Sequence, residues 1–154
     1  MVAGLFLLIG AVLGFVFNRS NDKRKAQLEA EVRWHEIVRT LSAAVFAHGQ
    51  RLKDISLEDY ELGKEMDDSI PMKARLAASL RAERKELVNK MSELTIIVPK
   101  TFTKALFEYT YDAIKSSDYE AAGREAAVGR LSDSSTALMK EVRKYLGLPG
   151  ATAE

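Results

Sequence analysis

The pattern of hydrophobic and polar residues changes most sharply at residue 17. Residues 1–17 contain no charged side chain, whereas Arg19, Asp22, Lys23, Arg24 and Lys25 follow within eight positions. A helix rises ~1.5 Å per residue, so the apolar run covers roughly 25 Å, at the short end of what crosses the hydrocarbon core of a bilayer. The pattern predicts a transmembrane anchor over residues 1–18, a helical domain over 19–146 and a flexible tail over 147–154.

The charge distribution beside this segment predicts its orientation. Basic residues flank only its C-terminal end, namely Arg19, Lys23, Arg24 and Lys25. Lys and Arg hold the adjoining end of a span in the cytoplasm, and they attract anionic lipid headgroups. We therefore expect the N-terminus outside and the C-terminal domain in the cytoplasm, as in a single-pass bacterial inner-membrane protein. A signal peptide and a buried or interfacial helix are the alternatives, but the basic n-region and the cleavage site of a signal peptide are lacking.

Small residues within the predicted span suggest helix packing in the membrane. Gly10 and Gly14 form a GxxxG motif, which lets a second backbone approach closely. The alternative is that glycine is simply common in membrane helices. A homo-oligomer formed through this face is therefore one hypothesis for the chain.

Apolar residues at spacings of three and four predict a helix over residues 22–55. Its seam consists of Trp34, Val38, Leu41, Val45, His48, Leu52 and Ile55. Ser56 and Asp59 then resemble a capping box, which predicts a separate short helix over 57–66. Gly49 weakens the first helix near its end and marks a possible bend.

Three further helices follow in the pattern. Pro71 stands near the first turn of a helix that runs to about residue 98, and Pro99 ends it. The next helix covers about 101–115, and the last runs from 119 to 146 and stops at Gly147. The sequence predicts an all-α fold, with the transmembrane helix followed by an antiparallel bundle of about four helices.

Composition and motifs give no support to catalysis. The chain has no cysteine, a net charge of +1, and two histidines that lack the Glu-x-x-His spacing of di-iron bundles. Neither a phosphate-binding glycine loop nor an EF-hand occurs. We interpret His48 as a hydrogen-bonded structural histidine and His35 as a surface residue. We expect no catalytic residue, no cofactor and no metal.

The segment after the predicted span contains one acidic and one basic stretch, which can neutralise each other within a bundle. Residues 54–68 hold seven acidic side chains and one basic one, whereas residues 73–104 hold eight basic and three acidic ones. The basic residues are spread around the helix, and the acidic segment can neutralise them, so nucleic acid is not an expected partner. Arg84 falls on an apolar stripe and needs a carboxylate or an outward path.

The helix at 101–115 carries more apolar surface than one seam requires. Phe102, Leu106 and Tyr109 follow core spacing, while Phe107 and Tyr111 widen the apolar surface beyond it. Such a helix is either central in a bundle or docks a partner. Phe107 and Tyr111 are accordingly the candidate partner surface.

These observations predict a non-enzymatic, membrane-anchored adaptor, assembly factor or accessory subunit. Its expected partners are the lipid bilayer and a membrane or cytoplasmic protein. The alternative is a small membrane-active effector or sensor, stress- or phage-related, whose transmembrane helix oligomerises through Gly10 and Gly14. A membrane-bound enzyme would require a pocket with convergent polar groups.

Overall fold

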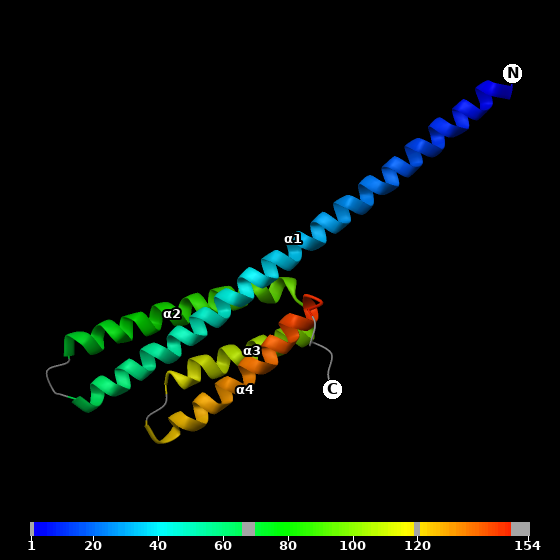
Figure 1. The fold of residues 1–154 in the computed structure, drawn as a ribbon. Helices are drawn as coiled ribbons and strands as arrows, with labels where there is room; N and C mark the ends of the chain where they lie inside the picture. Colours follow the sequence, from blue (N-terminus) through cyan, green and yellow to red (C-terminus); the bar gives the residue numbers. More distant parts are fainter. Residues whose placement is uncertain (1, 66–69, 119–120, 149–154) are drawn as a thin grey trace. The chain divides into compact units, whose positions relative to one another are not determined.

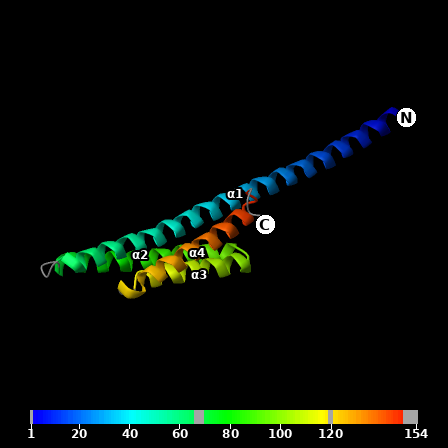
Figure 2. The same ribbon diagram turned by 60° about the horizontal axis from the view of Figure 1, so that its bottom comes forward.

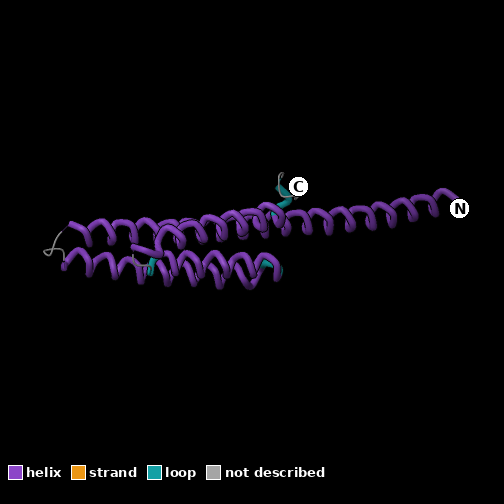
Figure 3. The backbone as a smooth tube through the Cα atoms, turned by 90° about the horizontal axis from the view of Figure 1, so that it is seen from below, coloured by secondary structure: helices purple, strands orange, loops and turns teal. Residues whose placement is uncertain are grey.

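The computed structural model describes residues 2–65, 70–118 and 121–148, excluding the side chains of residues 2–20, 62–65, 70 and 121–122. Four helices follow one another along this part of the chain (Figure 1). They are α1 (Val2–Glu65), α2 (Ile70–Ile97), α3 (Lys100–Ser116) and α4 (Ala121–Tyr145). Figure 3 shows only helices and loops in the described residues, without a strand. The predicted all-α fold is confirmed.

Pro99 and Gly147 mark helix boundaries, as predicted, since α2 ends at Ile97 and α4 ends at Tyr145. Pro99 is the N-cap of α3, with φ −71° and ψ 162°, and its carbonyl accepts the Thr103 amide at 3.0 Å. Gly147 adopts a positive φ of 65°, which a glycine tolerates without strain. The Leu148 amide then donates to the Arg143 carbonyl at 2.9 Å, which closes the end of α4.

The chain divides into two compact units, Met1–Ile37 and Val38–Glu154. In the second unit, successive helices run in alternating directions, and α3 and α4 lie side by side in both views (Figures 1 and 2). All four helices contribute to its core, whose members with no exposed surface are Val38, Val45, Leu52, Leu87, Leu94, Phe102, Leu106, Ala113 and Leu138. This unit is the antiparallel bundle.

Two expectations about α1 are wrong. The helix continues to Glu65, so the separate helix predicted over 57–66 does not exist. Ser56 is buried within α1 instead of capping a new helix, and its hydroxyl accepts a hydrogen bond from Arg124 Nη2 at 2.8 Å. Trp34 was expected on the buried seam but is 48% exposed, because periodicity shows which side of a helix is apolar and not whether another helix covers it.

The predicted transmembrane anchor is not confirmed. Among the described residues, no helix combines the length and the apolar character that a membrane crossing requires. Residue 1 and the side chains of residues 2–20 lie outside the described part of the chain. The boundary predicted between residues 18 and 19 stays a prediction.

Candidate functional site

Tyr109 is the residue that fixes α3 against α1. Its ring is 3% exposed and meets the ring of Phe46 edge-on, with 5.2 Å between the centroids. Its hydroxyl donates to the Phe46 carbonyl at 3.3 Å. Burial raises the pKa of Tyr109 to about 12, because the phenolate would lose its hydration. The phenol therefore stays neutral and continues to donate.

A second aromatic contact fixes α3 against α4. Phe102 is fully buried and packs edge-on against Tyr145, with 6.0 Å between the ring centroids. Phe102 and Tyr109 are seven residues apart, two turns along one side of the helix. Two anchors on the same side determine which residues of α3 point away from the core.

Phe107 and Tyr111 lie on the side of α3 that faces away from the core. Their side chains are 50% and 61% exposed, although the core beside them is closed by Phe102, Leu106 and Tyr109. An exposed pair of large aromatic rings one turn apart is unusual on a soluble surface unless it binds something. The structure thus places the two residues of the candidate partner surface next to each other and leaves both accessible.

Three exposed lysines lie on the same helix as these rings. Lys100, Lys104 and Lys115 are all exposed on α3. Lys115 Nζ lies 5.9 Å from the centre of the Tyr111 ring, within range of a cation–π interaction. Lys104 Nζ is 3.7 Å from Glu108 Oε1, and such an exposed pair contributes little to stability. We call Lys100, Lys104, Phe107, Tyr111 and Lys115 the α3 face.

The C-terminal end of α3 is held by Arg84 of α2. Its Nη2 donates to the Ser117 hydroxyl at 2.7 Å and also pairs with the Asp118 carboxylate. This is the carboxylate expected for an arginine on an apolar stripe. Ser117 is the C-cap of α3, so this contact links α2 to the residues that directly follow α3.

His48 has the structural role expected of it. Its Nδ1 lies 2.6 Å from the Glu83 carboxylate on α2, and Arg51 of α1 contacts the same carboxylate at 3.4 Å. Both His48 and Glu83 are largely buried, with 18% and 19% of their side chains exposed. His35 differs from the expected surface residue, since it is half-buried and engaged in an interaction.

The other sites predicted from the sequence belong to the N-terminal unit. Gly10, Gly14 and Arg19 fall among residues whose side chains lie outside the described part of the chain. Lys23, Arg24 and Lys25 are exposed on α1, accessible to a headgroup or to another protein.

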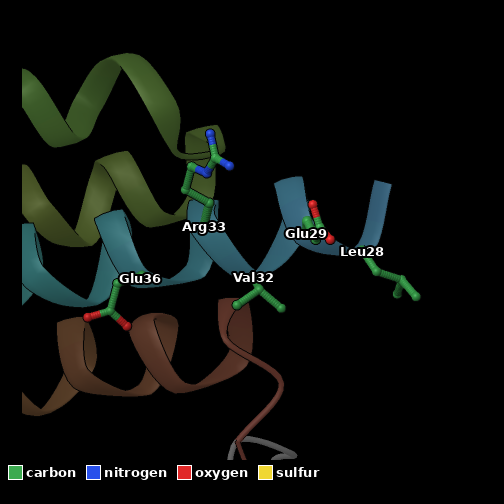
Figure 4. Close-up of a pocket in the computed structure, with 5 residues that line it drawn as sticks. All are labelled: Leu28, Glu29, Val32, Arg33 and Glu36. Carbon is green, nitrogen blue, oxygen red and sulfur yellow. The ribbon is translucent and has the colours of Figure 1, made fainter. Parts of the chain in front are cut away.

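Two surface hollows were not anticipated from the sequence. One, of about 560 Å³, is lined on α1 by Leu28, Glu29, Val32, Arg33 and Glu36. Figure 4 shows Leu28 and Val32 on one side of the helix and Arg33 on the other. In the sequence, only the four-residue spacing of Leu28 and Val32 indicated that these two apolar side chains share one side of α1. The other hollow, of about 310 Å³, lies between α3 and α4 and is lined by Glu108, Asp112, Arg130, Asp133, Ser134 and Ala137.

The hollow between α3 and α4 carries charged side chains from both helices. Within the described residues, no three His, Asp or Glu side chains are grouped to hold a metal ion. No protein-family model, curated protein or solved structure matches the chain. The α3 face, with two exposed rings among three lysines, is therefore the strongest candidate for a functional surface.

Proposed function

We propose that the chain is a non-enzymatic, membrane-tethered adaptor whose helical bundle binds a protein through the α3 face. In this account the N-terminal apolar segment holds the bundle at the bilayer, and the bundle presents Phe107 and Tyr111 to the partner. An accessory subunit or an assembly factor would use the same activity, because each acts by binding another protein.

The tether is supported by the sequence of the N-terminal unit. Residues 1–17 lack charge, and the basic cluster follows directly. Lys23, Arg24 and Lys25 are exposed on α1, as a cluster that contacts headgroups must be. The proposed orientation places the bundle in the cytoplasm, because basic residues stay on that side.

A single observation carries the binding proposal, namely the exposure of Phe107 and Tyr111 beside a closed core. Neither ring is needed to fill the bundle, because Phe102, Leu106 and Tyr109 already occupy the core side of α3. Aromatic side chains dominate interface energetics, since each buries a large rigid area with few rotatable bonds. The lysines of the α3 face favour a partner whose surface is acidic.

Co-purification from membranes tests this proposal. The full chain, carrying an affinity tag, is extracted in mild detergent from its native host, and the proteins that co-purify are quantified. We expect the Phe107→Ala/Tyr111→Ala variant to retain less than a tenth of a specific partner, a loss of about 1.4 kcal/mol or more. Circular dichroism should show an unchanged helical fold.

The matched control is Ile96→Ala on α2. Ile96 is the most exposed large apolar residue of the described chain, at 85%, so this variant removes a similar surface elsewhere. We expect it to co-purify the partner at the wild-type level. Equal recovery with wild type and with the double variant would contradict the proposed binding surface.

A further inference from the structure

The C-terminal part of α1 carries an acidic face of opposite character to the α3 face. Asp54, Leu57, Glu58 and Glu61 are all exposed, and their spacing places them on one side of the helix. Asp54 accepts a hydrogen bond from Gln50 at 2.9 Å. In the described part of the chain, no ion pair involves Glu58 or Glu61. We call these four residues the α1 acidic face.

The two faces match in spacing as well as in charge. Asp54, Leu57 and Glu61 stand at intervals of three and four residues, as do Lys104, Phe107 and Tyr111. Each face therefore has an apolar side chain at its centre and charges within one helical turn of it. Two helices that pack with these faces together would bury Leu57 against the aromatic rings and set carboxylates opposite lysines.

One chain does not satisfy both faces by itself. Leu57 is 37% exposed, and Phe107 and Tyr111 are at least half exposed in the same bundle. The nearest charged partner of Lys104 is Glu108 on its own helix, in a weak exposed pair. Complementary faces that remain exposed in one copy are available to another copy.

We propose that the partner of the α3 face is the α1 acidic face of a second copy of this chain. The contact joins two different surfaces. Two copies can therefore share one such contact, or they can share two equivalent contacts related by a two-fold axis. This inference rests on the proposed function and gives it a partner. The adaptor is then a self-assembling one, held at the bilayer by each N-terminal segment.

An anionic bilayer would also attract lysines flanked by aromatic rings. It would not account for the acidic face, which carries an exposed leucine at the same register and is repelled by anionic lipid. Charge complementarity within one sequence favours the second copy. The bilayer becomes one outcome of the experiment.

Charge exchange between two differently tagged full-length copies tests the proposal. The two copies are co-expressed and extracted in mild detergent, and recovery of the second tag with the first is quantified. We expect Lys100→Glu/Lys104→Glu in both copies to lower recovery at least tenfold, and Glu58→Lys/Glu61→Lys in both copies to do the same. One copy of each variant should recover a large part of the wild-type signal, because the charges are then complementary again.

The control variants make equal charge changes elsewhere on the bundle. Arg81→Glu/Lys85→Glu and Glu86→Lys/Glu125→Lys alter residues that are also exposed on α2 and α4. We expect both to pair at the wild-type level. Thermal unfolding of every variant should remain cooperative, which separates loss of pairing from loss of the fold.

Three outcomes would overturn the inference. Wild-type pairing by every variant would place self-association elsewhere, for instance at Gly10 and Gly14. Failure of the mixed pair to recover would show that the two faces do not contact each other. Labelling of lipid by a photoreactive side chain at position 107, in phosphatidylglycerol nanodiscs without any pairing, would assign the face to the bilayer. The proposed function can survive each of these outcomes. It would still be supported if a different protein co-purifies with the wild-type chain and does not co-purify with the Phe107→Ala/Tyr111→Ala variant.

Discussion

Tyr109 of α3 lies directly over Gly49 of α1. A Cβ atom added at residue 49 would be 2.7 Å from Tyr109 Cζ, and the Tyr109 hydroxyl oxygen would be closer still. Gly49 therefore leaves the space against α1 that the Tyr109 ring occupies, and the bend suggested for this position stays a prediction. The absence of a side chain there lets Tyr109 reach the Phe46 carbonyl, which anchors the helix that carries the α3 face.

The first prediction concerns this contact. We expect Gly49→Ala to destabilise the bundle by about 1–3 kcal/mol, because the buried ring must shift. At Gly129 of α4 an added Cβ meets nothing within 4 Å, so Gly129→Ala should stabilise by up to ~1 kcal/mol through helix propensity. Urea unfolding of both variants measures the difference.

A double-mutant cycle gives the control for that prediction. Tyr109→Phe removes the atom nearest to residue 49 and should cost about 0.5–1.5 kcal/mol for the lost hydrogen bond. Gly49→Ala should then cost less in the Tyr109→Phe background than in wild type. Additive effects would contradict the close approach of the two residues.

The second prediction concerns alkaline pH. The pKa of Tyr109 is raised from 10.0 to about 12 by burial, so the unfolded chain releases the phenolic proton first. The contribution of the neutral phenol to stability is complete below pH 10 and is lost as pH rises toward 12. The loss approaches about 1.4 kcal/mol per pH unit in that window. Unfolding midpoints measured across it should fall less steeply in Tyr109→Phe than in wild type.

The third prediction separates the two sides of α3. Phe102→Ala should destabilise the bundle by about 3–5 kcal/mol, because it removes a fully buried ring. Phe107→Ala and Tyr111→Ala should each change stability by less than about 1 kcal/mol, since both rings are at least half exposed. Thermal melts of the three variants measure this. A large and equal loss in all three would place the whole helix in the core and leave no partner surface.

The fourth prediction concerns the orientation of the chain in a membrane. A reporter that is active only in the cytoplasm should be active when fused after Glu154. Replacing Arg19, Lys23, Arg24 and Lys25 by uncharged residues should weaken that preference, because basic residues hold their side of a span inside. Activity of only a periplasmic reporter in the wild-type fusion would contradict the proposed topology.

The parts of the fold that local chemistry determines were predictable from the sequence. Pro99 lacks an amide proton and Gly147 accepts a positive φ, so both ended helices where expected. The proposed cap at Ser56 is wrong because α1 continues through it to Glu65, and the Ser56 hydroxyl instead accepts a hydrogen bond from Arg124, 68 residues later. The sequence around Ser56 contains nothing that announces such a distant partner.

The exposure of Phe107 and Tyr111 was predictable for a similar reason. Helical spacing separated Phe107 and Tyr111 from Phe102 and Tyr109, and the structure shows that separation in their exposure. The role of Gly49 was not predictable, because it depends on a ring that another helix brings to it. The match between the α3 face and the α1 acidic face was not predictable either. It depends on which charged side chains stay exposed in the folded bundle, and the sequence alone does not give that.

The central claim is that the exposed aromatic side of α3 is a binding surface for protein. Site-specific photocrosslinking in intact cells tests it most directly, with a photoreactive phenylalanine replacing Phe107 and, as the control, Ile96 of α2. The account predicts a discrete protein adduct from position 107 that is absent from position 96, although Ile96 is the more exposed residue. No protein adduct at position 107, or the same adducts at both positions, would contradict it.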